Sequence, residues 1–192
     1  MTQQRDSVVT AERFAGGMTW QQYLEQIKRN REKFAHNYEE AALSDADVEA
    51  FRSLAAKADG PAKVLALAED WCPDVFRGLP VMARIAEAAE LELRIFPRDE
   101  NLDIINEFLN QGEHQSIPTF VFYTGDHRYI GHWIERPAKA NAEMGQVRAL
   151  FQDKEGEEAR ALYNEFQRGP VWASWRQETV RELRELLQEK CG

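Results

Sequence analysis

The sequence has 192 residues and a mass of 22.2 kDa, which fits one mid-sized domain whose core can fold without metals or disulfide bridges. Hydrophobic residues make up 43% and charged residues 30%, values that argue against disordered and fibrous proteins. The formal net charge of -9 and the pI near 5.1 would repel phosphate backbones, so we expect no nucleic-acid partner.

Targeting signals and cysteine content narrow the class of protein further. No apolar run approaches the ~20 residues of a membrane span, and the start MTQQRDSVVT has neither the basic residues nor the apolar stretch of a signal peptide. We therefore expect a cytoplasmic protein with no membrane partner. Cys72 and Cys191 are too few and too far apart for a Cys-rich zinc site or a disulfide framework, so any cysteine chemistry rests on single thiols.

The first sixty residues predict two amphipathic helices behind a mobile first dozen residues. Thr19 with Gln22 and Ser44 with Asp47 have the spacing of capping boxes, and apolar residues recur at helical spacing after each box. The first of these helices is expected to continue from Trp20 to Phe34. The second helix is expected to end at the breaker cluster Asp59-Gly60-Pro61.

Strands and helices alternate in the middle of the chain. The apolar run KVLALA is typical of a strand that is covered on both faces, and LELRIF indicates a second strand. The helical pattern between them implies a right-handed parallel pair. Thr124-Gly125-Asp126 indicates a hairpin turn. In chain order we predict a strand at 63–68, a helix at 73–90, a strand at 91–96, a helix at 101–111, and hairpin strands at 117–123 and 128–134.

Everything beyond Pro137 is predicted to be helical, over 138–153, over 158–167, and from Gly169-Pro170 to the end. Trp172 and Trp175 continue an apolar stripe, which predicts the face by which the last helix docks on the core. The pattern as a whole predicts an α/β protein with a central mixed sheet of about four strands flanked by helices.

Cys72 is the candidate nucleophile. It lies between the strand 63–68 and the helix 73–90, where unpaired backbone N–H groups and the positive end of the helix dipole stabilise a thiolate. The alternative is a buried cysteine that serves only as a small hydrophobic side chain.

The residues around Cys72 resemble the thioredoxin family. The resemblance rests on the strand that ends in Trp71-Cys72, on Pro80 eight residues after the cysteine, and on Ile117-Pro118-Thr119 at the start of a later strand. It implies a thioredoxin-like fold in which the Ile117–Pro118 bond is cis and lies against the active-site cysteine. On this interpretation one globular unit contains an N-terminal helical extension packed on the core at 1–60, a thioredoxin-like core at 61–153 and a C-terminal helical extension at 154–192.

A narrower resemblance is to a bacterial subgroup of thioredoxin-like proteins with Glu-Asp-Trp-Cys, Arg-Asp-Glu-Asn and Trp-x-x-Arg-Pro signatures. These proteins also carry a helical N-terminal segment with an anchor such as Tyr23. The resemblance implies a fold rather than an activity. The matching segments are 69–74 (EDWCPD), 98–101 (RDEN), 111–112 (QG), 116–120 (SIPTF) and 131–137 (GHWIERP).

Two departures from ordinary thioredoxins bear on mechanism. The resolving cysteine expected three residues after Cys72 is Val75, and the buried carboxylate expected six residues before it is Ala66. The intramolecular dithiol cycle therefore cannot run at this motif, which argues against a general protein-disulfide reductase. Cys191 is the only internal alternative, and a cysteine next to the chain end is more often incidental.

Charged residues surround the thiol. Carboxylates within three residues of Cys72 raise the pKa of its thiol and oppose the helix effect, so a compensating cation is needed. Two arginines that follow neighbouring strands are expected to approach the same edge. Alternatively, these arginines pair with the first two carboxylates and only hold the loops. The carboxylates are Glu69, Asp70 and Asp74, and the arginines are Arg98 and Arg136.

The remaining site residues shape the edge beside the thiol. Trp71 and Trp133 are predicted to form an aromatic rim, with core packing as the alternative for Trp133. We expect no cofactor and no metal, because His114 and His132 lack the spacing of a metal pair with Cys72. The other residues expected to bind substrate or shape the site are Pro73, Asp74, Ile117, Pro118 and Thr119.

Two functions follow from these features. The first is monothiol thiol–disulfide exchange in cell redox homeostasis, in which Cys72 attacks a disulfide and an external thiol, on a protein or a small molecule, releases the mixed disulfide. The second is a non-catalytic thioredoxin-fold module that binds a partner segment at the cis-proline edge. Carboxylates that point at the sulfur would favour binding, and carboxylates that are paired with Arg98 or Arg136 would favour a reactive thiol.

Overall fold

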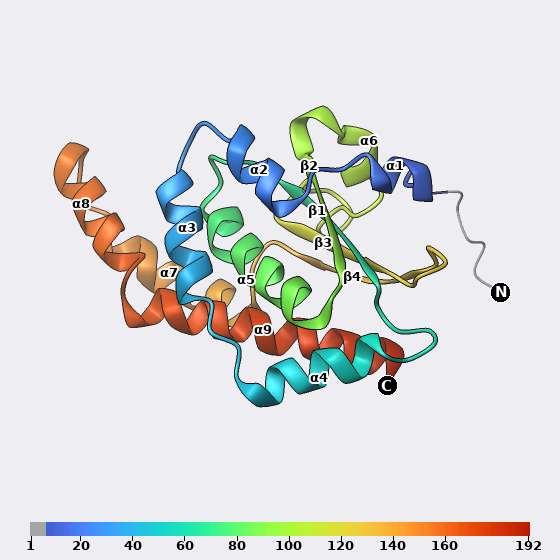
Figure 1. Ribbon diagram of the computed structural model, residues 1–192. Coiled ribbons are helices and arrows are strands. Elements are labelled where there is room, and N and C mark those ends of the chain that lie inside the picture. The colour runs from blue at the N-terminus through green and yellow to red at the C-terminus, as the bar shows by residue number, and fades with distance from the viewer. Residues whose placement is uncertain (1–6) are drawn as a thin grey trace.

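A computed structural model describes residues 7–192, and a four-stranded mixed sheet lies at its centre (Figure 1). The strand order is β2-β1-β3-β4. β1 (Lys63–Ala68) runs parallel to β2 (Glu92–Pro97) and antiparallel to β3 (Thr119–Tyr123), and β3 is antiparallel to β4 (Tyr129–Ile134). The predicted α/β class and the four-stranded mixed sheet are confirmed.

The central strand β1 is buried on both faces, as its apolar sequence predicts. All five residues after Lys63 are fully buried. Helix α5 (Pro73–Ala89) packs on one face and passes close to the start of β3, where a Cβ on Gly78 would come within 3.3 Å of Pro118. A glycine at this position therefore lets the helix approach Pro118 closely.

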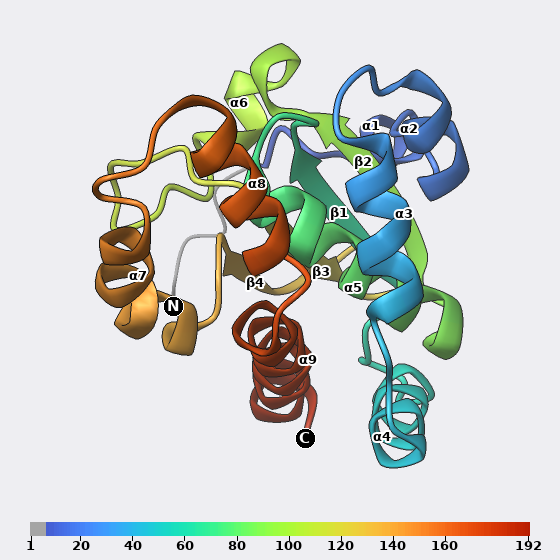
Figure 2. The same ribbon diagram turned by 90° about the vertical axis from the view of Figure 1, so that its left-hand side faces the viewer.

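Helices cover both faces of the sheet (Figures 1 and 2). Helices α3, α4 and α9 pack against α5, and α9 also contacts β4. On the opposite face, Phe14 meets Tyr123 and Phe108 meets Tyr129, with ring centroids 6.3 Å apart in both pairs. The remaining helices are α1 (Ala11–Ala15), α2 (Trp20–Gln26), α3 (Arg31–Glu40), α4 (Asp45–Ala55), the 3-10 turn η1 (Arg98–Glu100), α6 (Leu102–Ile105), α7 (Ala138–Leu150), α8 (Gly156–Phe166) and α9 (Pro170–Cys191).

The N-terminal region differs from the prediction of two helices, because four helices lie between residue 7 and β1. Both capping boxes form, but the helix that starts after Thr19 ends at Gln26 instead of reaching Phe34. The carboxylate of Asp70 accepts hydrogen bonds from the backbone N–H groups of Lys28 (2.9 Å) and Arg29 (3.0 Å), which holds the chain in a loop there. A tertiary contact therefore overrides the helical pattern.

The prediction of a mobile first dozen residues is wrong for the part that the structure describes. Ser7 and the backbone N–H of Val8 both donate to Glu107, at 2.8 and 2.6 Å, and Val9 is buried. Residues 1–6 lie outside the described residues.

The helix predicted over 101–111 is also wrong. Only η1 and the four residues of α6 are helical, and turns follow, with positive φ angles at Gln111 (54°) and Gly112 (77°). Asn110 donates to Ser116 (3.2 Å) and Glu135 (3.1 Å), so its side chain joins the turns to the hairpin. Asparagine competes well with helical hydrogen bonds, and this segment is rich in it.

The predictions for the last three helices agree with the structure to within a few residues. Trp172 and Trp175 are buried, and the Trp172 indole donates to the Asn37 side chain at 2.9 Å. The last helix is thereby attached to α3. The proposed boundaries at 60/61 and 153/154 stay predictions. In the described part of the chain, none of the helices has both the length and the apolar character needed to cross a membrane.

Candidate functional site

Cys72 is the N-cap of α5 and follows directly on the loop after β1. Its side chain is 8% exposed, and its Sγ lies 3.6 Å from the carbonyl oxygen of Ile117, to which the thiol donates. The Ile117–Pro118 peptide bond is cis. The thiol and the proline loop, which are 45 residues apart in the chain, are therefore in contact.

Burial raises the pKa of the Cys72 thiol above its ordinary value. The backbone N–H groups of Val75 and Asp74 lower the pKa, as the position at a helix N-terminus predicts. The charge of Asp74 raises the pKa and the charge of Arg136 lowers it. The helix effect is thus present, but desolvation of the thiolate outweighs it.

Asp74 is the carboxylate whose charge raises the pKa of the Cys72 thiol, and two arginines bind it. Its Oδ1 accepts from Arg77 at 2.6 Å and its Oδ2 lies 2.9 Å from Arg136 Nη2, while Arg136 also pairs with Glu135. The side chain of Asp74 is only 12% exposed, so both partners compensate a buried charge. Of the two predicted cations, Arg136 is the one that reaches the carboxylate beside Cys72.

Sequence reasoning missed Arg77, whose side chain is 1% exposed. Its guanidinium carbon lies 5.0 and 5.3 Å from the ring centres of Trp172 and Trp175, which belong to α9. The signal in the sequence is the spacing of Arg77 three residues after Asp74, at which side chains on a helix meet.

The other two predicted carboxylates bind backbone groups. Glu69 accepts from the N–H of Asp99 at 2.8 Å, and Asp70 binds the loop after α2 as described above. Arg98 pairs with Asp99 at 2.5 Å. Arg98 and Arg136 form no ion pair with Glu69 or Asp70 among the described residues, but the segment Arg98-Asp99 does bind Glu69 through the backbone N–H of Asp99.

The two predicted rim tryptophans lie in different environments. Trp71 is 43% exposed, and the guanidinium of Arg98 lies 5.4 Å from the centre of its ring. Trp133 is buried, stacks on Phe120 with ring centres 5.5 Å apart, and donates to Glu182 of α9 at 2.8 Å. Trp133 therefore belongs to the core, and only Trp71 can form a rim.

Pro73 and Thr119 take structural positions beside the thiol. Pro73 is the first residue of α5, where its missing N–H costs nothing. Thr119 is fully buried, and its hydroxyl donates to the carbonyl oxygen of Ser116 at 2.9 Å. Thr119 thus supports the proline loop from within the core.

Helix α8 closes one side of the site, in front of the beginning of α5 and between α7 and α3 (Figure 2). Lys33 Nζ lies 5.0 Å from the ring centre of Phe76, one turn after Cys72, and 5.6 Å from that of Tyr163 in α8. Burial raises the pKa of Tyr163, and the charges of Asp74 and Cys72 add to this rise. Sequence reasoning did not identify Lys33 or Tyr163, because neither is near Cys72 in the chain.

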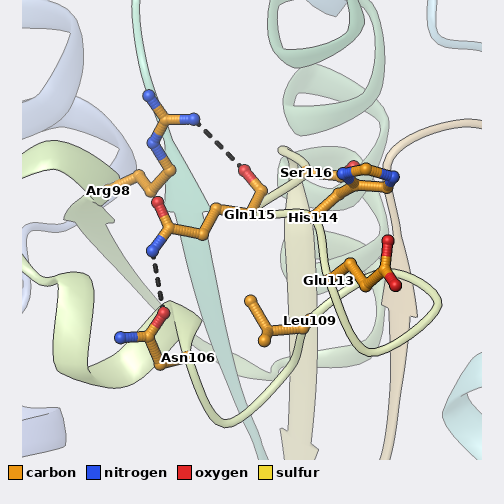
Figure 3. A pocket seen from close by; sticks show the side chains of 7 residues that line it. All are labelled: Arg98, Asn106, Leu109, Glu113, His114, Gln115 and Ser116. Carbon is orange, nitrogen blue, oxygen red and sulfur yellow. Dashed lines mark hydrogen bonds between the residues drawn. The ribbon is translucent and has the colours of Figure 1, made fainter.

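An open pocket of about 380 Å³ lies at the residues that precede the proline loop (Figure 3). Arg98 Nη1 donates to the carbonyl oxygen of Gln115 at 3.1 Å, and Gln115 Nε2 donates to Asn106 at 2.8 Å. The pocket is lined by Arg98, Asn106, Leu109, Glu113, His114, Gln115 and Ser116.

Cys191 lies at the opposite end of the sheet from Cys72. Its carbonyl oxygen accepts from Lys57, which precedes β1, whereas Cys72 follows β1. A strand of this length spans about 20 Å. Both cysteines are free, and the fold excludes Cys191 as an internal partner of Cys72. Within residues 7–192, no three His, Cys, Asp or Glu side chains are grouped as metal ligands.

The comparisons with known proteins agree with this architecture. The profile of a family described as thioredoxin matches residues 17–158. A crystal structure of a protein of unknown function from Pseudomonas aeruginosa is similar, with a TM-score of 0.69 at 15% identity over 94% of this chain and 98% of that one. The crystal structure of an HIV epitope-scaffold has a TM-score of 0.66 at 17% identity over 93% and 97% of the two chains. These likenesses show the fold, and no curated protein matches the sequence.

Proposed function

The chain belongs to the thioredoxin family, and we propose that Cys72 performs monothiol thiol–disulfide exchange in the cytoplasm. The Cys72 thiolate attacks one sulfur of a disulfide, and the other sulfur leaves as a thiolate that takes up a proton. A mixed disulfide on Cys72 remains. An external thiolate, on a small molecule or a protein, then attacks this mixed disulfide and releases Cys72.

One observation carries this proposal. The Cys72 sulfur lies where the N-terminus of α5 meets the proline loop, 3.6 Å from the Ile117 carbonyl oxygen. This position combines helix N–H groups, which stabilise a thiolate, with a backbone edge beside the sulfur. A cysteine that only filled the core would need neither.

The charge of Asp74, which raises the pKa of the Cys72 thiol, is compensated in part. A carboxylate facing the sulfur would oppose the thiolate, but Asp74 is bound by Arg77 and Arg136. Arg136 acts as a positioning residue, because it holds Asp74 and its charge lowers the pKa of Cys72. A carboxylate that is paired with Arg136 in this way favours a reactive thiol.

The mixed disulfide on Cys72 needs an external thiol for its release, because the chain has no resolving cysteine within reach. Val75 is fully buried three residues after Cys72 and cannot form a disulfide, and Cys191 lies at the far end of the sheet. The mixed disulfide must therefore wait for a second molecule, so the rate of the cycle depends on the concentration of that thiol.

We also propose that the chain belongs to the bacterial subgroup with Glu-Asp-Trp-Cys, Arg-Asp-Glu-Asn and Trp-x-x-Arg-Pro signatures. Hydrogen bonds and ion pairs link the three signature segments. Glu69 of the first binds the backbone of Asp99 in the second, and Arg136 of the third binds Asp74 beside the first. The signatures thus make one connected frame around the thiol.

A non-catalytic binding module is the second candidate. It is favoured by the low exposure of Cys72 (8%) and by the raised pKa of its thiol, both of which reduce the thiolate available for attack. In this case the same edge would hold a partner segment without a covalent step.

The deciding experiment is mass spectrometry of conjugates trapped from cell extract on the Cys191→Ser protein, in which Cys72 is the only thiol. Exchange predicts a disulfide-linked conjugate that dithiothreitol removes and that the Cys72→Ser variant does not form. The binding module would be supported instead if the Cys191→Ser protein forms no conjugate and both variants retain one and the same partner without a covalent bond.

A further inference from the structure

Three exposed cations lie next to the loop that carries Cys72. Lys28 and Arg29 belong to the loop between α2 and α3, and Arg31 is the first residue of α3 (Figure 1). We call these three residues the basic segment. Within residues 7–192, their side chains form neither an ion pair nor a hydrogen bond, so their charges are available to a partner in solution.

The backbone of the basic segment is fixed beside the thiol. The Asp70 carboxylate accepts hydrogen bonds from the backbone N–H groups of Lys28 and Arg29, at 2.9 and 3.0 Å. The side chain of Asn30 donates to the carbonyl oxygen of Asp70 at 2.8 Å. Asp70 is two residues before Cys72 in the chain. The cations are therefore held at the same edge as the candidate nucleophile.

Trp71 gives this edge an apolar surface. It is the residue between Asp70 and Cys72, and its side chain is 43% exposed. The guanidinium of Arg98 lies 5.4 Å from the centre of its ring, but Arg98 is paired with Asp99 and adds little net charge. An exposed ring beside three unpaired cations suits an extended chain that carries both apolar and acidic side chains.

The local charge is opposite in sign to that of the whole protein. The chain carries a formal charge of -9, whereas residues 25–33 contain four cations and two carboxylates, Glu25 and Glu32. Glu69 and Asp70 also lie nearby, and their carboxylates bind backbone N–H groups. Charges farther apart than about 8 Å are largely screened at physiological ionic strength. An acidic segment at this edge therefore interacts mainly with the basic segment, and much less with the acidic remainder of the surface.

The exposure of the three cations favours a protein partner over a small anion. Solvent and salt weaken an exposed ion pair, which changes an affinity by no more than about fivefold. Recognition by such pairs therefore requires several of them at once. A chain with several carboxylates can supply them, whereas a small anion carries only one or two charges.

We propose that the basic segment and Trp71 dock an acidic segment of a protein whose disulfide Cys72 attacks. The proposal rests on the exchange function above and names its partner class. The sulfur–sulfur bond of the partner breaks, one of its sulfurs joins Cys72, and the other leaves as a thiolate that takes up a proton. The ion pairs form before this step and raise the rate at which the two molecules meet in the reactive orientation.

The test compares three capped peptides on the Cys191→Ser protein, namely Glu-Glu-Cys-Glu-Glu, Gln-Gln-Cys-Gln-Gln and Lys-Lys-Cys-Lys-Lys, each activated as a mixed disulfide with 2-thiopyridine. The rate at which a peptide adds to Cys72 is divided by its rate with free 2-mercaptoethanol, which removes intrinsic reactivity. We expect a normalised preference of about tenfold for the acidic over the neutral peptide at about 0.1 M salt. The preference should vanish at about 1 M salt, where exposed charges are screened within about 3 Å.

The variant Lys28→Gln/Arg29→Gln/Arg31→Gln should abolish this preference. Its fold should persist, because the bonds to Asp70 come from backbone N–H groups that glutamine keeps. A matched triple variant makes the same change in net charge at the opposite end of the sheet, where β1 begins, and should retain the preference. The control substitutions are Lys57→Gln, Lys63→Gln and Lys190→Gln.

A non-reactive probe separates this proposal from the proposed function. The acidic peptide with serine in place of its cysteine is titrated against the Cys72→Ser protein, and the indole signal of Trp71 in NMR spectra is the readout. Binding that the basic-segment variant loses supports docking even if Cys72 reacts with none of the peptides, an outcome that would reject exchange alone. If no peptide reacts and the probe does not bind, docking is rejected as well.

Three kinetic results would overturn the proposal. The first is equal normalised rates for the acidic and neutral peptides, and the second is an acidic preference that persists in the basic-segment variant. The third concerns the small dianion 3,3′-dithiodipropionate. If its rate falls in the basic-segment variant as much as that of the acidic peptide, the cations recognise a small anion and not a protein segment.

Discussion

Arg136, which follows β4, holds Asp74 of α5 with 2.9 Å between its Nη2 and the carboxylate Oδ2. This ion pair joins the end of the hairpin to the first turn of the helix that begins at Cys72. It also sets the local charge, because the carboxylate raises the pKa of the thiol and the guanidinium lowers it. The position of one arginine therefore affects both the geometry and the reactivity of the site.

Replacement of Arg136 by Gln should slow the alkylation of Cys72. The variant removes the charge of Arg136, which lowers the pKa of the thiol, and keeps the charge of Asp74, which raises that pKa. Less thiolate is therefore present at neutral pH. Iodoacetamide rates measured from pH 6 to 10 on the Cys191→Ser background should shift to higher pH, with Arg148→Gln as control. An unchanged profile would show that the ion pair is only structural.

The stability of the protein should fall at alkaline pH partly because of Cys72. Burial raises the pKa of the folded thiol above that of the unfolded chain, so the stabilisation is fully present below the unfolded pKa, ~8.5, and is lost as the pH rises through the folded value. Urea unfolding at pH 7.5 and 10 should show a smaller loss for Cys72→Ala than for the native chain. The native chain is the reference, and a loss as large in Cys72→Ala as in the native chain would contradict the prediction.

Removal of the Tyr163 side chain should expose the thiol. Tyr163 approaches the start of α5 from α8, a helix with no buried residue, so this helix is held mainly by aromatic contacts. Loss of a contact worth about 1 kcal/mol should raise the rate of Cys72 modification by dithionitrobenzoate roughly fivefold. Tyr129→Ala, on the opposite face of the sheet, should leave the rate unchanged. A rate unaffected by Tyr163→Ala would mean that α8 does not limit access.

Val75→Cys should create an internal disulfide with Cys72. Residues three apart in the first turn of a helix have the Cα separation of ~5 Å that a disulfide requires. The oxidised variant should lose two hydrogens by mass and resist iodoacetamide, whereas Val81→Cys, equally buried but farther along α5, should not. Mixed disulfides on the Val75→Cys protein should then resolve without an added thiol, and persistence of such conjugates would argue against this.

Local patterns in the sequence predicted most of the fold. The apolar run at β1, the hairpin turn and the position of Cys72 at a helix start all depend on residues near one another, and each agrees with the structure. The break after α2 could not be predicted in this way, since it depends on Asp70, which lies 42 residues beyond the backbone group of Lys28 that it binds.

Long-range contacts also explain the misjudged site residues. The inward orientation of Trp133 follows from its register opposite Phe120 and from Glu182 on a helix that comes much later in the chain. Arg77 is polar within an apolar helix, and its role became visible only with the tryptophans of α9 around it. Cys72 could be identified from its residue type and its position at a helix start. The side chains around it depend on how distant segments of the chain pack.

The contact of Arg77 with the last helix has a consequence for the order of synthesis. Cys72 and Asp74 leave the ribosome about a hundred residues before Trp172 and Trp175, the rings on which Arg77 rests. During that interval Arg77 lacks the two rings that pack against its guanidinium. The packing around Arg77, and through Asp74 the surroundings of the thiol, is therefore complete only after α9 has been translated and has docked.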